Sequence, residues 1–123
     1  MHRTVIFVFN ADATLFEQAG DFMKRLLTPD KYQCNLCMVT YGQFGAMKGE
    51  WRSFIDSLSE NKEFLHREEF HKKHPRYKDT PLPAIFVTSD GETLSILVSR
   101  EEINTVKTIS ELETLLTEKL KRA

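Results

Sequence analysis

The chain contains two cysteines, Cys34 and Cys37, and their spacing suggests chemistry. Two thiols three residues apart can close a small disulfide ring, while one of them still attacks a disulfide in another molecule. If Cys34 begins a helix, unpaired N–H groups and the helix dipole would stabilise its thiolate. The motif therefore predicts thiol–disulfide exchange, in which Cys34 forms a mixed disulfide and Cys37 resolves it.

The same two thiols are also suited to binding zinc. His71 and His74 would complete a tetrahedral Cys2His2 set, and His66 offers a further combination. A simpler interpretation is that residues 67–74 form a solvated helix face buried only at Phe70, with both cysteines packed in the core. In a cytosolic protein this cysteine spacing is typical of redox or metal chemistry. We favour exchange without a cofactor and keep zinc as the alternative.

Two further side chains are candidate substrate contacts. Asp12 follows an apolar run, and open α/β sheets bind ligands at the carboxyl ends of such strands. Its carboxylate is equally suited to capping the next helix. Tyr32 precedes Cys34 by two residues.

The glycine-rich stretch 42–49 lacks the Lys-Ser/Thr pair of a phosphate loop, so nucleotide hydrolysis is not predicted.

The first half of the chain reads as a strand followed by helices. Val5–Phe9 is a continuous apolar run, which predicts a strand buried on both faces at the centre of a sheet. A helix is expected from Asp12 to about residue 27, before Pro29. Residues 31–49 fit either a helix opening at Cys34 or a short strand over 36–41, and we favour the helix.

The second half has clearer boundaries. A helix carrying Trp51 should end near residue 59, with its aromatic ring in the core together with Tyr41 and Phe44 rather than in an exposed patch. A brief strand over 64–66 and a short helix over 67–74 are expected next. Residues 84–88 and 93–98 predict a hairpin with Gly91 in its turn. Thr108 begins a capping box and an amphipathic terminal helix. The apolar stripe of that helix comprises Ile109, Leu112, Leu115, Leu116 and Leu120.

The sequence over about residues 60–121 resembles the C-terminal half of the thioredoxin fold, and Val5–Phe9 matches its central strand. The matching features are Leu82-Pro83 before a strand, the hairpin, and the closing helix. The resemblance implies an α/β fold with a central mixed sheet flanked by helices. It also implies that Pro83 is the family's cis-proline and lines the substrate groove beside the two sulfurs. A non-catalytic binding module on the same scaffold, with cysteines that are structural or bind zinc, is the alternative function.

Composition restricts the possible partners. The 123 residues are 41% hydrophobic and 28% charged, which fits one domain over residues 1–123. The 17 Lys and Arg residues against 18 Asp and Glu argue against nucleic-acid binding by a general basic field, although a local patch remains open. No apolar run approaches the roughly 20 residues of a membrane span, and the start does not resemble a secretory signal. We therefore expect a cytoplasmic protein acting on protein or small-molecule thiols and disulfides. Its oligomeric state is not indicated.

Overall fold

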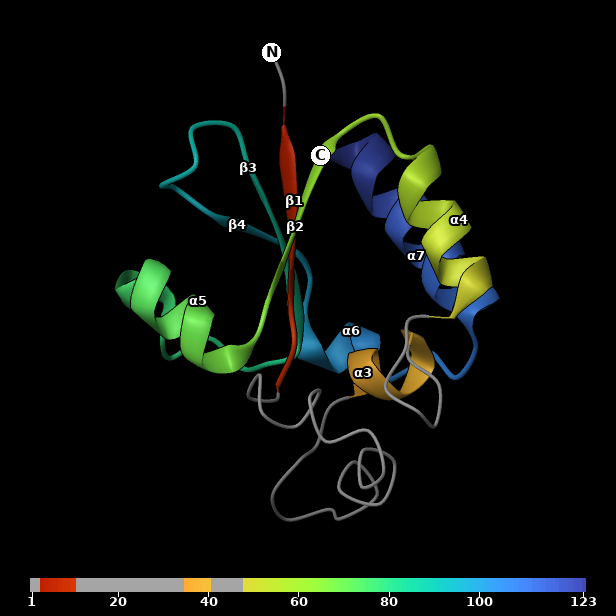
Figure 1. The fold of residues 1–123 in the computed structure, drawn as a ribbon, viewed down its shortest axis with the longest axis horizontal. Helices are drawn as coiled ribbons and strands as arrows, with labels where there is room; N and C mark the ends of the chain where they lie inside the picture. The colour runs from red at the N-terminus through yellow and green to blue at the C-terminus, as the bar shows by residue number, and fades with distance from the viewer. Residues whose placement is uncertain (1–2, 11–34, 41–47) are drawn as a thin grey trace.

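The computed structural model describes residues 3–10, 35–40 and 48–123 (Figure 1). The predicted helix from Asp12, together with Tyr32, Cys34, Tyr41 and Phe44, lies outside the described residues. The described elements are, in chain order, β1 (Thr4–Val8), α3 (Asn35–Thr40), α4 (Gly49–Ser57), β2 (Asn61–Leu65), α5 (Arg67–Lys73), the short 3-10 helix η2 (Pro75–Tyr77), β3 (Ala84–Thr88), β4 (Ser95–Val98), α6 (Arg100–Ile103) and α7 (Ile109–Arg122).

The four described strands form one mixed sheet with the order β2-β1-β3-β4. β1 runs parallel to β2 and antiparallel to β3, and β4 completes an antiparallel hairpin with β3. Val8, the last residue of β1, lies opposite both Leu65 and Ala84. The carboxyl ends of β1 and β2 therefore meet the beginning of β3 at one end of the sheet. The expected mixed α/β architecture is confirmed.

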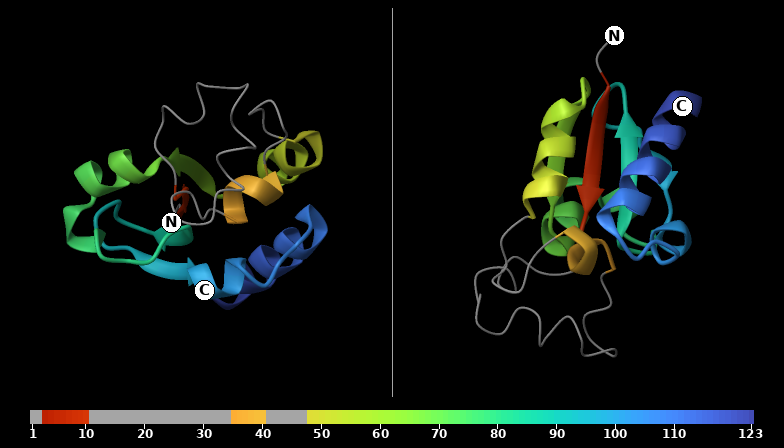
Figure 2. Two further views of the ribbon diagram at one scale, coloured as in Figure 1. Left: turned by 90° about the horizontal axis from the view of Figure 1, so that it is seen from below. Right: turned by 90° about the vertical axis from the view of Figure 1, so that its right-hand side faces the viewer.

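Helices cover both faces of the sheet (Figures 1 and 2). Val5 and Phe7 of β1 belong to the core that contains Leu36 of α3, Trp51 of α4 and the buried residues of α7. Ile6 and Val8 belong to the core on the opposite face, which contains Phe70 of α5. Because alternate side chains of a strand point to opposite faces, the apolar run of β1 serves two cores at once. The prediction of a central strand buried on both faces is confirmed.

Aromatic rings fill both layers. The Trp51 ring meets the Phe7 ring edge-on at 5.8 Å between centroids, and Phe64 stacks on Phe7 at 4.8 Å. On the other face, the rings of Phe70 and Phe86 stack at 5.1 Å. Trp51 is only 1% exposed, so its assignment to the core is confirmed. Burial of large apolar surfaces of this kind is the main contribution to folding.

The hairpin between β3 and β4 contains the expected glycine turn. Gly91 has a φ of 81°, a conformation that side chains with a Cβ disfavour. The Asp90 carboxylate accepts hydrogen bonds from the backbone N–H groups of Thr93 at 2.8 Å and Glu92 at 2.9 Å. These bonds favour the ionised form and hold the pKa of Asp90 at about 2. The turn is thus closed by the carboxylate as well as by the glycine.

Several boundaries differ from the expectations. β2 begins at Asn61, three residues before the predicted strand, which the sequence concealed because the first residues of this edge strand are polar. β4 begins at Ser95 rather than residue 93, and α4 ends at Ser57 rather than near residue 59.

α6 was not predicted at all. Its start contains a capping box in which Ser99 and Glu102 satisfy each other's backbone N–H groups. This Ser-x-x-Glu signal was present in the sequence and would have located the helix.

Candidate functional site at the carboxyl end of the parallel strands

The candidate site lies at the end of the sheet where β1 and β2 stop. α3 lies at this end and beside α6 (Figures 1 and 2). It begins at Asn35, directly after Cys34 in the chain, and includes Cys37. The preference for a helix over a strand in this stretch is confirmed. Asp12 and Cys34 lie outside the described residues, and of Cys37 only the place in the helix is described.

Internal contacts hold α3 in position. Leu36 and Val39 are buried in the core that lies between the sheet and the helices α4 and α7. The Thr40 hydroxyl is buried and donates to the Leu36 carbonyl at 2.6 Å, while the Lys48 N–H donates to the Thr40 carbonyl at 2.9 Å. The helix with the second cysteine is therefore anchored through one apolar face, and its end is tied to the start of α4.

Pro83 lies at the same end of the sheet. The Leu82–Pro83 peptide bond is cis, as the family resemblance implies. Ala84 pairs with Val8, so Pro83 lies beside the position where β1 ends. Pro83 itself is buried. The structure thus brings Pro83 and the helix containing Cys37 to one end of the fold, whereas its contact with the sulfurs remains a prediction.

His66 and Glu69 form the adjoining edge of this site. His66 caps α5: its backbone N–H donates to the Glu69 carboxylate at 2.8 Å, and its Nδ1 lies 2.6 Å from the same carboxylate. The hydrogen bonds from His66 lower the pKa of Glu69. The His66 ring also lies 6.1 Å from the Phe9 ring, between centroids. This connects the start of α5 to the end of β1.

The same corner contains the one group of potential metal ligands found among the described residues. Donor atoms of His66, Glu68 and Glu69 all lie within 4.8 Å of one another. The capping box of α5 already explains why His66 and Glu69 are neighbours. Neither His71 nor His74 belongs to this group.

The two histidines of the predicted zinc set lie on α5 and at its end, across the sheet from α3 (Figure 1). The Phe70 side chain of α5 belongs to one core, and Leu36 of α3 belongs to the other. Cys34 and the side chain of Cys37 lie outside the described residues, so a zinc ion shared by all four predicted ligands remains a prediction.

His74 differs from the expectation of a solvated segment buried only at Phe70. Its side chain is 6% exposed and its ring lies 5.7 Å from the Phe70 ring, between centroids. Burial lowers the pKa of His74, and the nearby Lys73 ammonium lowers it further, while Glu63 opposes both. The simple interpretation was wrong at this residue because η2 turns the chain back after Pro75, a tertiary feature that helical spacing does not reveal.

Comparisons with known proteins add no assignment. Neither the protein-family models nor the curated proteins nor the solved structures contain a match to this chain. Within the part of the chain that the structure describes, no helix is long and apolar enough to cross a membrane.

Proposed function

We propose that this protein is a thiol–disulfide oxidoreductase with a thioredoxin-like domain, in which Cys34 and Cys37 exchange disulfides with protein or small-molecule thiols. The observation that carries the proposal is that α3, which includes Cys37, lies at the end of the sheet where Pro83 precedes β3 (Figure 1). Parallel β1 and β2, the antiparallel β3–β4 hairpin and the closing α7 agree with the resemblance seen in the sequence.

The proposed reaction is a balanced two-electron exchange. The Cys34 thiolate attacks one sulfur of a partner disulfide, which forms a mixed disulfide and releases the other partner sulfur as a thiolate. The Cys37 thiolate then attacks the Cys34 sulfur, closes the Cys34–Cys37 disulfide and releases the second partner thiolate. The partner is reduced and the cysteine pair is oxidised. An external dithiol restores the reduced pair by the reverse exchange.

A binding module with a zinc ion is the second candidate function. The chain contains the four ligands that such a site needs, but the buried residues of α3 and α5 belong to cores on opposite faces of the sheet. Exchange requires only the two cysteines and the surface at one end of the sheet. We therefore favour exchange over a structural zinc site.

Cysteine variants of the full chain test the proposal directly. Since Cys34 and Cys37 are the only two cysteines, every thiol signal of the protein comes from them. The wild type should equilibrate with glutathione between a dithiol and an intramolecular disulfide. Cys37→Ser should accumulate a mixed disulfide with a small aromatic disulfide, detectable by mass spectrometry, because no resolving thiol remains. The double variant Cys34→Ser/Cys37→Ser is the matched control and should not react.

The alternatives give different results. One equivalent of zinc in the purified wild type, lost in Cys34→Ser, would support the binding module instead. If both single variants were less stable and the wild type formed no disulfide under mild oxidation, the cysteines would be structural and the proposal would be wrong.

A further inference from the structure

A second candidate site lies at the end of α5. A cavity of about 390 Å³ lies between η2 and the turn that connects β3 to β4. Its wall includes Lys73, His74, Arg76 and Tyr77 on one side and Gly91 and Glu92 on the other. A volume of this size falls in the usual range of small-ligand sites, about 300–1,000 Å³.

The charged side chains that line this cavity, among the described residues, are Lys73, Arg76 and Glu92. The segment over residues 71–79 contains four basic residues, Lys72, Lys73, Arg76 and Lys78, and one carboxylate, Asp79. Lysines in the last turn of a helix interact favourably with its negative end, which accounts for Lys72 and Lys73. Arg76 and Lys78 follow α5, so the dipole of α5 does not explain them.

Arg76 is available to a ligand. Its guanidinium lies 5.7 Å from the centre of the Tyr77 ring, and the side chain is exposed. Among the described residues no carboxylate lies within ion-pair distance of it, in contrast to Lys73, which pairs with Glu63 at 2.9 Å. A guanidinium presents its donors in a planar fork that matches phosphate oxygens.

Two neutral groups in the wall add hydrogen-bonding capacity. The Tyr77 hydroxyl accepts a hydrogen bond from the Leu94 N–H at 2.9 Å, and its own proton remains to be donated. His74 is 6% exposed, and its Nε2 has no hydrogen-bond partner in the described part of the chain. Buried polar atoms are nearly always hydrogen-bonded, so an unpartnered imidazole nitrogen on a residue that lines the cavity is unusual.

We propose that the cavity between η2 and the β3–β4 turn binds a phosphate group, held by Arg76 with Tyr77 and His74. Glu92 is the one carboxylate in the described part of the wall. It is exposed to solvent, so dissolved salt screens its repulsion of a bound phosphate. The ligand is either free phosphate, alone or in a small phosphorylated molecule, or the headgroup of a phospholipid. None of the described residues that line this cavity is a cysteine, so a test of phosphate binding is independent of the test of the exchange reaction.

The test is a titration of the full chain with inorganic phosphate, followed by amide NMR at constant ionic strength maintained with sodium chloride. Saturable shifts are expected at the amides of residues 73, 74, 76, 77, 91 and 92. Arg76→Ala should weaken phosphate binding about tenfold, the loss typical of one charge-assisted interaction. Arg52→Ala is the matched control, because it removes the same charge from an exposed position on α4, on the opposite face of the sheet.

Sedimentation with vesicles containing phosphatidic acid distinguishes the two sources of phosphate. Binding to inorganic phosphate without cosedimentation identifies a free ligand, while Arg76-dependent cosedimentation identifies a lipid headgroup. The proposal is overturned if neither probe binds, or if Arg52→Ala weakens binding as much as Arg76→Ala does.

Discussion

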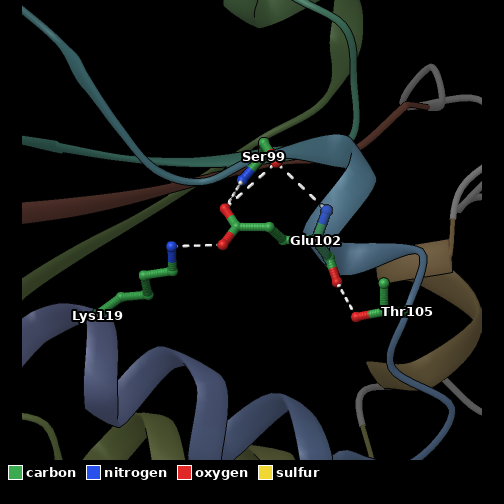
Figure 3. Close-up of polar contacts among 4 residues, drawn as sticks. All are labelled: Ser99, Glu102, Thr105 and Lys119. Carbon is green, nitrogen blue, oxygen red and sulfur yellow. Dashed lines mark hydrogen bonds and ion pairs between the residues drawn. The ribbon is translucent and has the colours of Figure 1, made fainter.

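The Lys119 ammonium of α7 forms an ion pair with the Glu102 carboxylate of α6 (Figure 3). The other carboxylate oxygen of Glu102 accepts from the Ser99 N–H at 3.1 Å, and the Ser99 hydroxyl accepts from the Glu102 N–H at 3.3 Å. The Lys119 hydrogen bond and then the Ser99 N–H lower the pKa of Glu102. One side chain therefore caps α6 and attaches it to the terminal helix.

Replacing Glu102 with alanine should lower the free energy of unfolding at pH 7 by about 1–2 kcal/mol, since it removes a capping interaction and a partly exposed ion pair. Glu101→Ala is the control: Glu101 is exposed and its closest ion-pair contact, with Arg100, is 3.6 Å. Urea denaturation should show less than about 0.5 kcal/mol for the control. An equal effect in both variants would contradict this role of Glu102.

The contribution of Glu102 should also depend on pH. Its pKa is lower in the folded state than the ordinary 4.5, so its contribution is present above pH 4.5 and is lost as the pH falls through the folded-state pKa. The difference in stability between wild type and Glu102→Ala should therefore shrink on acidification. A difference that stayed constant down to the acid transition would exclude this linkage.

The two described glycines should respond oppositely to alanine. A Cβ at either position meets no atom within 4 Å, so the backbone conformation decides the outcome. Gly91→Ala should destabilise the protein by about 1–2 kcal/mol, because alanine disfavours the φ of 81°. Gly49→Ala, at the first residue of α4, should be neutral or stabilise by up to about 1 kcal/mol. Thermal unfolding of the pair measures this contrast, and an equal loss of stability at both sites would contradict the prediction.

His74 should make stability fall on mild acidification. Its pKa is lower in the folded state than the ordinary 6.5, so below pH 6.5 the unfolded chain takes up a proton that the folded protein does not. Stability should therefore decrease as the pH falls from 6.5 towards the folded-state pKa. His74→Gln should flatten this part of the pH profile, measured by urea denaturation between pH 7.5 and about 5.

His71→Gln provides the comparison for His74, since it removes a partly exposed imidazole from the same helix. The slope of the wild type should survive in this variant. If His74→Gln kept the wild-type slope while His71→Gln lost it, the pH dependence would belong to the more exposed histidine.

Local patterns in the sequence determined most of the elements. The uninterrupted apolar residues of β1, the glycine turn of the hairpin and the hydroxyl that caps α7 each act through neighbours a few residues away. Thr108 accepts the Glu111 N–H as expected, although the Glu111 carboxylate accepts from the Lys107 N–H and the Thr108 hydroxyl. Strand period, turn chemistry and helix capping are short-range effects, which is why one chain reveals them.

Tertiary structure decided the features that depend on residues far apart in the chain. The polar start of β2 becomes a strand because β1 offers it parallel hydrogen-bonding partners, and Pro83 reaches the end of β1 through the pairing of Ala84 with Val8. His74 is buried because the chain turns back after α5. Such contacts gain their stability only when distant segments meet, so no local periodicity encodes them. The position of Pro83 relative to the cysteine sulfurs also depends on tertiary structure. The mixed-disulfide experiment with Cys37→Ser tests the exchange reaction that this position would serve.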